Sequence, residues 1–253
     1  MNECEHEQLC TLMGGSGKIL IFTGAGISTN SGIPDFCGPG GVWTRRNPVF
    51  YQDFMRSGKA RVEHWEYKLE VWDDFKNAVP NAVHQGIVKL EKAGKIHKVT
   101  TQNIDGLHQK AGTSCGLLVE LHGTNAEVEC QKCLLRTEPE VHFEYFRSTG
   151  KPPLCRCGGF LKSATISFGQ NLHPEDIQGA ENAADQADLV IALGSSLSVY
   201  PAATIPLLAT RRGVPYIIIN RGETEHDGDS TVTLRLKGDV SDIFPPAVES
   251  ILS

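Results

Sequence analysis

Residues 18–33 read KILIFTGAGISTNSGI and join an apolar run directly to a glycine-rich turn. The run at 18–23 is short and almost wholly apolar, as expected of a parallel strand that is buried on both faces. Gly24 and Gly26 follow at once, and glycines there let a backbone approach a pyrophosphate. Thr29 stands where a strict dinucleotide fingerprint needs glycine, so this turn alone leaves nucleotide binding and a plain strand-to-helix turn both open.

The same change from apolar strand to helix continues along the chain. Further strands are predicted at 96–101, 117–123, 188–194 and 214–220. Helices are predicted at 81–93, with Asn81 as N-cap, at 201–213, with Pro201 in the first turn, and at 239–252. Alternating strands and helices are typical of an α/β fold, here a doubly wound, parallel, Rossmann-like sheet.

Three segments depart from this alternation. Residues 33–50 are rich in proline and glycine and predict a loop, and residues 51–79 show helical spacing of aromatic side chains. Residues 125–163 hold four clustered cysteines and many charges. We therefore expect one catalytic domain over 1–253, with a large lobe at about 15–37, 81–124 and 164–253. A small, zinc-binding lobe is expected at about 38–80 and 125–163.

Length and charge limit the class of protein. The chain has 253 residues and a net charge of −6, which argues against a general nucleic-acid binder with a basic surface. The acidic N-terminus shows no secretory signal, and the longest apolar stretches are too short to cross a bilayer. The sequence predicts a cytoplasmic protein that binds neither nucleic acid nor membrane.

Polar side chains follow two of the predicted strands. The segment TQNIDGLH (101–108) offers Gln102, Asn103 and Asp105, and ELHGT (120–124) offers His122. Ligand sites of open α/β folds form at the carboxyl ends of parallel strands, so these groups are expected to lie together. Amides and a carboxylate can recognise a polar ring and hydroxyls, and a histidine can transfer a proton near neutral pH.

The four clustered cysteines have the pattern of a metal site. They form the pairs CQKC (130–133) and CRC (155–157), and two such pairs are typical of a tetrahedral structural zinc. The second pair has one residue between its cysteines where two are usual, so a lost site or redox-active thiols remain as alternatives. The predicted zinc ligands are Cys130, Cys133, Cys155 and Cys157.

Taken together, GAGISTNSGIPDF (24–36), TQNIDGLH, ELHGT and GSS (194–196) resemble the motifs of the sirtuins, the NAD-dependent protein lysine deacylases. The resemblance runs from about residue 17 to 250. It implies removal of acetyl groups from lysines in extended protein or peptide segments. NAD would be consumed, giving nicotinamide and O-acyl-ADP-ribose, and the zinc would be structural.

The resemblance also implies residue roles. His122 would be the general base, acting with Asn103 and Asp105. Phe36 would guard the nicotinamide pocket, while Cys37 replaces the arginine that the family commonly has in the flexible cofactor loop. The implied cofactor-binding residues are Gly24, Ala25, Gly26, Thr29, Asp35, Phe36, Cys37, Gln102, Asn103, Ile104, Asp105, His122, Gly194, Ser195, Ser196, Asn220 and Val240.

The segment ISFGQNL (166–172) resembles the strand that pairs with the substrate backbone, although a plain edge strand would also fit. The substrate-binding residues would be Ile166, Phe168 and Gly169. Sirtuins that favour acidic acyl groups carry a tyrosine and, three residues later, an arginine. Here Tyr67 is followed at that spacing by Glu70, which predicts a short neutral acyl group.

Two other functions remain open from the sequence. One is mono-ADP-ribosyl transfer or NAD hydrolysis at the same site, because the loss of the loop arginine at Cys37 could admit another nucleophile. The other is a weakly catalytic module that senses NAD or ADP-ribose.

Overall fold

The computed structural model describes residues 2–35 and 46–253. Its centre is a six-stranded sheet in the order β3-β2-β1-β7-β8-β9, in which every neighbouring pair is parallel. The doubly wound parallel fold is therefore confirmed. The strands are β1 (Ile19–Thr23), β2 (Ile96–Thr101), β3 (Leu118–Glu120), β7 (Leu189–Leu193), β8 (Tyr216–Asn220) and β9 (Leu234–Lys237). The strand order reverses between β1 and β7, where such sheets open a crevice for ligands.

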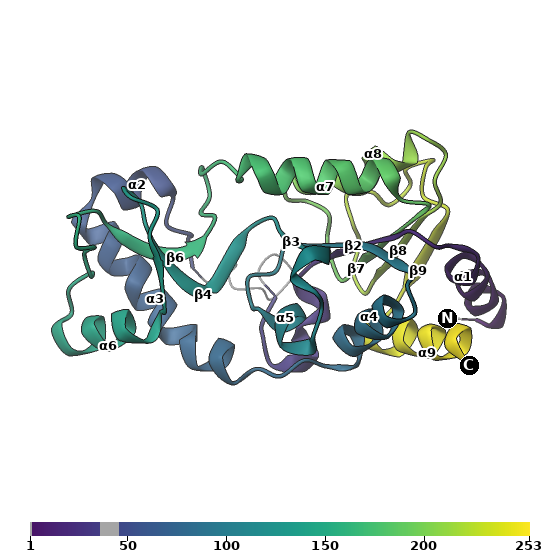
Figure 1. Cartoon of the computed structure of the whole chain (residues 1–253), viewed down its shortest axis with the longest axis horizontal. Helices are drawn as coiled ribbons and strands as arrows, with labels where there is room; N and C mark the ends of the chain where they lie inside the picture. The colour runs from purple at the N-terminus through teal and green to yellow at the C-terminus, as the bar shows by residue number, and fades with distance from the viewer. Residues whose placement is uncertain (1, 36–45) are drawn as a thin grey trace.

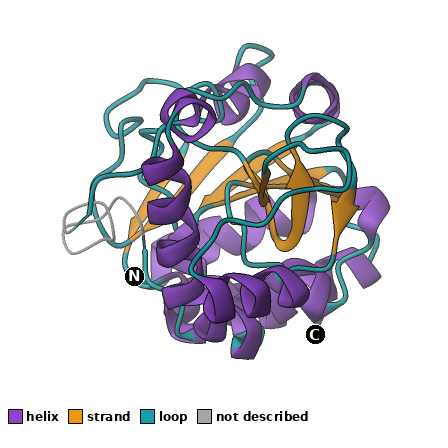
Figure 2. Ribbon diagram, turned by 90° about the vertical axis from the view of Figure 1, so that its left-hand side faces the viewer, coloured by secondary structure: helices purple, strands orange, loops and turns teal. Residues whose placement is uncertain are grey.

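Helices cover both faces of this sheet (Figures 1 and 2). One face packs on α1 (Glu3–Gly15), α4 (Ala82–Lys92) and α9 (Val240–Leu252), and the other on α7 (Pro174–Gln186) and α8 (Thr204–Thr210). An apolar core lies on each face of the sheet, and β1 contributes to both. Ile19 and Ile21 point into one core, and Leu20 and Phe22 point into the other. Burial on both faces explains why this strand is apolar throughout.

A second, antiparallel sheet lies at one end of the molecule, at the left of Figure 1. It has the order β5-β4-β6 and packs with two helices, at 58–77 and 140–149, around a separate apolar core that includes Trp65, Trp72 and Phe143. Its elements are β4 (Gly123–Cys130), β5 (Arg136–Thr137), β6 (Leu161–Thr165), α2 (Tyr51–Arg56), α3 (Gly58–Asn77) and α6 (Glu140–Thr149). The residue bounds given above for the two lobes stay a prediction.

Several local predictions need correction. The sequence patterns did not reveal α1, α7 or β9; α1 buries only Leu9 and Met13 and so shows little periodicity. Helix α8 begins at Thr204, after turns at 201–203, and not at Pro201. Residues 166–172 do not form a strand, since β6 ends at Thr165 and a loop with turns follows.

Short elements complete the chain: the 3-10 turns η1 (Ala25–Ile27) and η2 (Thr29–Ser31) after β1, α5 (Leu107–Ala111) after β2, and the 3-10 turn η4 (Cys115–Leu117) before β3. Within residues 2–35 and 46–253, none of the helices is both long and apolar enough to cross a membrane.

Candidate active site

A cavity of about 930 Å³ lies at the carboxyl ends of the parallel strands and extends to the smaller sheet. Every predicted cofactor- or substrate-binding residue within the described ranges lines it. Phe36 and Cys37 lie outside the described residues. The predicted residues that line the cavity are Gly24, Ala25, Gly26, Thr29, Asp35, Gln102, Asn103, Ile104, Asp105, His122, Ile166, Phe168, Gly169, Gly194, Ser195, Ser196, Asn220 and Val240.

The glycine-rich turn brings the ends of β1 and β7 into contact. The Gly26 amide donates to the Gly194 carbonyl at 2.8 Å, and the Gly24 amide donates to the Leu193 carbonyl at 3.0 Å. A Cβ atom on Gly24 or Gly26 would lie 2.8 Å from backbone atoms of Gly194, so a larger residue would force the strand ends apart. The turn leads into η1 and η2, and Thr29 fits there because its backbone needs no left-handed conformation.

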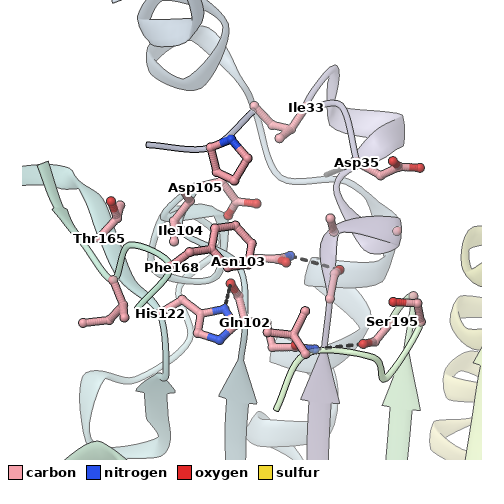
Figure 3. Close-up of a pocket in the computed structure, with 18 of the residues that line it drawn as sticks. Ile33, Asp35, Gln102, Asn103, Ile104, Asp105, His122, Thr165, Phe168 and Ser195 are labelled. Carbon is pink, nitrogen blue, oxygen red and sulfur yellow. Dashed lines mark hydrogen bonds between the residues drawn. The ribbon is translucent and has the colours of Figure 1, made fainter. Parts of the chain in front are cut away.

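An amide, a hydroxyl and a carboxylate form one buried network beside this turn. Figure 3 shows two of its members, Asn103 and Asp105. Asn103 Nδ2 donates to the Gly24 carbonyl at 3.1 Å and to Ser28 Oγ at 3.2 Å. Ser28 Oγ donates to Asp105 Oδ2 at 2.7 Å, and the other Asp105 oxygen accepts from the Leu107 amide at 2.9 Å. Burial raises the pKa of Asp105, while these hydrogen bonds oppose the rise. Ser28 was not among the predicted site residues, although it lies within the glycine-rich motif.

His122 is held with one ring nitrogen directed at the backbone. Its Nδ1 lies 3.1 Å from the Gln102 carbonyl oxygen. A carbonyl can only accept, so Nδ1 carries the proton and Nε2 keeps its lone pair. Burial lowers the pKa of His122, and the hydrogen bond to Gln102 only partly offsets this, so the ring is neutral at pH 7. The side chain is therefore ready to accept a proton at Nε2.

Two neighbours fix the surroundings of His122. Gln102 Nε2 donates to Ser195 Oγ at 2.8 Å and thereby links the ends of β2 and β7. The Ile166 amide donates to the His122 carbonyl at 2.8 Å, which places the loop after β6 beside the histidine. His108, in contrast, is buried with Nε2 3.0 Å from Thr23 Oγ1 and does not line the cavity, as expected of a structural histidine.

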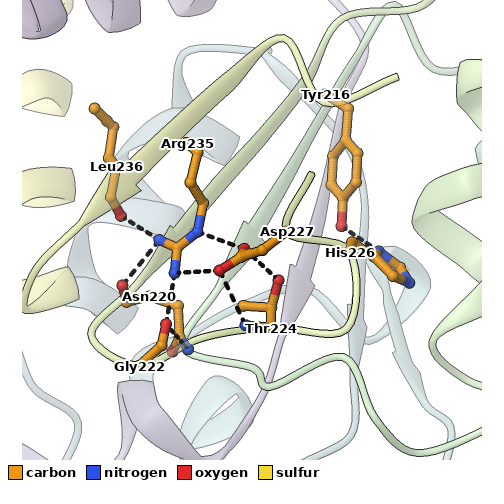
Figure 4. Close-up of polar contacts among 8 residues, drawn as sticks. All are labelled: Tyr216, Asn220, Gly222, Thr224, His226, Asp227, Arg235 and Leu236. Carbon is orange, nitrogen blue, oxygen red and sulfur yellow. Dashed lines mark hydrogen bonds and ion pairs between the residues drawn. The ribbon is translucent and has the colours of Figure 1, made fainter. Parts of the chain in front are cut away.

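The far end of the cavity, beyond β8, is held by one guanidinium group (Figure 4). Arg235 donates to the backbone carbonyls of Asn220, Gly222 and Leu236, and pairs with Asp227 at 2.7 Å. Asn220 Nδ2 in turn donates to the Gly222 carbonyl at 3.1 Å. Arg235 thus fixes the loop that carries Asn220, a role that no sequence motif indicated.

The four predicted metal ligands converge. The sulfur atoms of Cys130, Cys133, Cys155 and Cys157 all lie within 4.8 Å of one another. The amides of Lys132 and Cys133 point at the Cys130 sulfur at 3.4 and 3.5 Å, as in sites that stabilise thiolates. Four thiolates at these separations fit tetrahedral zinc, so the short Cys155-x-Cys157 pair can chelate.

Helix α3 contributes Tyr67 to the cavity, and also His64 and Lys68, which the sequence did not indicate. Glu70 is not among the residues that line the cavity; its carboxylate pairs with Arg46 at 2.7 Å and is largely exposed. Glu70 is therefore not placed to repel an acidic acyl chain, contrary to the expectation from its spacing to Tyr67. The helix turns Glu70 away from the face that carries His64 and Lys68.

The fold and the cavity define an α/β protein with a nucleotide-type crevice and a neutral histidine base beside it. A sequence model described as the Sir2 family matches residues 24–201, and the chain belongs to this family. It is 41% identical to an NAD-dependent protein deacetylase of Rhodopseudomonas palustris, over 96% of this chain and 95% of that protein. It is 40% identical to an NAD-dependent protein deacetylase of Sulfurisphaera tokodaii, over 92% and 91%.

Solved structures agree with this relationship. A Sir2 structure with a p53 peptide and NAD+ superimposes with a TM-score of 0.86 at 36% identity, covering 96% of this chain and 97% of that one. A structure of Sir2 bound to an acetylated peptide gives a TM-score of 0.85 at 34% identity, with the same coverage.

Proposed function

We propose that this protein is an NAD-dependent protein lysine deacetylase. The observation that carries the proposal is the arrangement of His122, whose Nε2 is a free base in the cavity that Asn103 and Asp105 also line. Relatives at about 40% identity over nearly the whole chain are deacetylases of this kind. NAD is the co-substrate, and the four-cysteine cluster holds a zinc ion that stabilises the small sheet and takes no part in the chemistry.

The reaction assigns a specific step to His122. The amide oxygen of acetyl-lysine forms a bond to the ribose carbon of NAD, and the bond from that carbon to nicotinamide breaks with its electron pair. His122 Nε2 then accepts a proton from a ribose hydroxyl, whose oxygen attacks the former acyl carbon. Addition of water and departure of the lysine amine give O-acetyl-ADP-ribose. The protein thus uses positioning and one base, without a covalent bond to itself.

The cavity residues divide between the parts of this reaction. We assign Asn103, Asp105 and Ile104 to the nicotinamide side, and Gln102 to the ribose. The Gly24–Thr29 turn and Gly194–Ser196 would hold the phosphates, and Asn220 and Val240 the adenosine. The turn suits phosphates because Gly24 and Gly26 have no side chains to keep a ligand away from the backbone, while Val240 offers a buried apolar contact.

The acetylated segment would bind along the loop after β6. The Phe168 and Gly169 carbonyls are engaged by the Tyr51 amide and by Gln52 Nε2, which fixes this loop against α2. Ile166 is held at His122, so an acyl-lysine beside it would reach the base. A peptide that binds through main-chain hydrogen bonds is selected for its extended conformation more than for a particular sequence. A lysine-bearing partner in the cytoplasm suits a chain in which none of the described cysteines forms a disulfide.

The test is mass spectrometry of an acetyl-lysine peptide incubated with the protein, with and without NAD. We expect loss of the acetyl mass and formation of nicotinamide and O-acetyl-ADP-ribose only with NAD. A peptide that gains the mass of ADP-ribose would indicate a transferase, and free ADP-ribose with an unchanged peptide would indicate a hydrolase. Binding of NAD without any turnover would indicate a sensing module.

A further inference from the structure

We propose that His108 is a positioning residue for the loop 102–106, which carries the groups assigned to the nicotinamide side of the cavity. The inference rests on the proposed deacetylase function and deepens it. Asn103 and Asp105 of this loop line the cavity, whereas His108 does not. Its ring instead ties the two ends of the loop together, because His108 belongs to α5, which follows the loop, and contacts Thr23 beside the strand that precedes it.

The first end of the loop depends on the hydroxyl group of Thr101, the last residue of β2. Its Oγ1 accepts a hydrogen bond at 3.0 Å from the amide of Asn103, two residues further on. A local turn of this kind fixes the backbone of the residue that donates. The same Oγ1 accepts from Thr23 Oγ1 at 2.7 Å, and both threonines are buried. Two buried hydroxyl groups therefore set the position of the Asn103 backbone.

His108 orients these hydroxyl groups. Thr23 uses its hydroxyl proton in the bond to Thr101, so the 3.0 Å contact between Thr23 Oγ1 and His108 Nε2 requires the histidine to donate. Burial lowers the pKa of His108 to about 3, so the ring is neutral at pH 7 and carries its proton on Nε2. A neutral ring in one tautomer thus directs Thr23 at Thr101, whose oxygen holds the Asn103 amide.

The second end of the loop is held by the backbone next to His108. Helix α5 begins at Leu107, whose amide donates to Asp105 Oδ1 at 2.9 Å. His108 is the next residue, so the bond from its ring to Thr23 holds this first turn against the end of β1. One histidine therefore supports both the Asn103 amide and the turn that fixes the Asp105 carboxylate.

Stability alone does not account for a histidine at this position. His108 is 1% exposed, its Nδ1 has no hydrogen-bond partner within the described residues, and its ring packs edge-on against His84 at 5.2 Å. A buried polar atom without a partner is destabilising, and an apolar side chain of similar size would avoid that cost. What the imidazole adds is the bond from Nε2, whose effect reaches the cavity.

The experiment uses paired variants that remove or keep one hydrogen-bonding group. His108→Leu removes the donor, whereas His108→Gln keeps a donor that can reach Thr23. Thr101→Val removes the acceptor of the Asn103 amide with little change in shape, whereas Thr101→Ser keeps it. His142→Leu is the matched control, because His142 Nε2 lies 2.8 Å from a threonine hydroxyl in the small sheet, and His142 does not line the cavity.

Two quantities are measured for each variant at a temperature well below its unfolding: kcat for nicotinamide release with an acetyl-lysine peptide, and affinity for ADP-ribose by calorimetry. His108→Leu and Thr101→Val should each lower kcat by about 10-fold or more, since a misplacement of about 1 Å can cost about 10²-fold in rate. The double variant should lose no more than the worse single variant, because both changes act on the same amide. Affinity for ADP-ribose, which lacks nicotinamide, should not change. His108→Gln, Thr101→Ser and His142→Leu should keep the wild-type kcat.

Hydrogen exchange of the segment 102–107, followed by mass spectrometry without substrates, gives a readout that needs no turnover. This segment should exchange faster in His108→Leu by about 10-fold or more, because the hydrogen bonds that close the loop are weakened. In His108→Gln and in the control His142→Leu, the segment should exchange as it does in the wild type.

The outcomes separate this inference from the proposed function. A wild-type kcat in both His108→Leu and Thr101→Val would overturn it, and so would losses that multiply in the double variant. A parallel loss of ADP-ribose affinity would also overturn it, since that would indicate a general structural role for His108. If His108→Leu does not fold, the comparison of Thr101→Val with Thr101→Ser decides, and equal kcat values would refute the inference. If the wild type releases no nicotinamide, the proposed function fails, and unchanged exchange of the segment 102–107 in His108→Leu would still overturn the positioning role.

Discussion

Replacing His122 by alanine tests the assignment of the base. The side chain makes one hydrogen bond in the described structure, from Nδ1 to the Gln102 carbonyl, so its removal should cost the fold only about 1 kcal/mol. A general base contributes about 10²–10⁴-fold to rate, which is roughly 3–5 kcal/mol of transition-state stabilisation. We expect kcat to fall by at least about 10²-fold while NAD binding and thermal unfolding change little.

The pH dependence of activity gives a second, independent test of the role of His122. Only neutral His122 can accept the proton, and burial holds its pKa below the ordinary value for histidine. Wild-type activity should therefore persist as the pH falls to that ordinary value. At lower pH the ring becomes protonated, and a plot of log kcat against pH should then have a slope of one. The His122→Ala variant should lose this acidic limb.

The assay is nicotinamide release from an acetyl-lysine peptide between pH 5 and 9, with NAD affinity measured by calorimetry. A matched control is His97→Ala, which removes a histidine from β2 that does not line the cavity and should keep wild-type kinetics. Turnover by His122→Ala at close to the wild-type rate would refute the role of His122. Loss of NAD binding in step with activity would instead show that the histidine acts in binding.

Three further perturbations have defined outcomes. Cys133→Ala should lower the zinc content from about one per chain and lower the melting temperature, whereas Cys115→Ala, outside the cluster, should do neither; a metal-free, equally stable wild type would contradict this. Arg235→Ala should raise KM for NAD by about 10-fold with little change in kcat, because charged hydrogen bonds to the Asn220 loop are lost, and Arg212→Ala, whose carbonyl partners lie away from the cavity, should not. Burial lowers the pKa of His108 to about 3, so the unfolded chain binds the extra proton as the pH falls below about 6.5, and stability falls with it. Between pH 7 and 5, the free energy of unfolding measured with urea should therefore fall by about 2 kcal/mol less in His108→Gln than in the wild type. An equal fall in both proteins would contradict the burial of a neutral ring.

The sequence by itself determined the sheet and much of the cavity. Apolar runs that end in glycine or polar residues give parallel strands, and in such a sheet all carboxyl ends meet at one edge. The ends of β1, β2 and β7 therefore had to bring Gly24, Asn103 and Ser195 together, and they line one cavity. Short elements with weak periodicity, such as β9, could not be recognised because the pattern of burial in four residues carries little information.

Only the tertiary structure decided which side chains of α3 face the ligand. Successive residues of a helix are turned by about 100°, so Lys68 and Glu70 point to nearly opposite sides. Which side faces the cavity depends on how Trp65 and Trp72 pack into the small core, and that core is assembled from β4, β6 and α6, far away in sequence. The same packing buries Lys68 against Asn125 and pairs Glu70 with Arg46. The amine lines the cavity and the carboxylate does not, because long-range packing, not local spacing, sets the rotation of the helix.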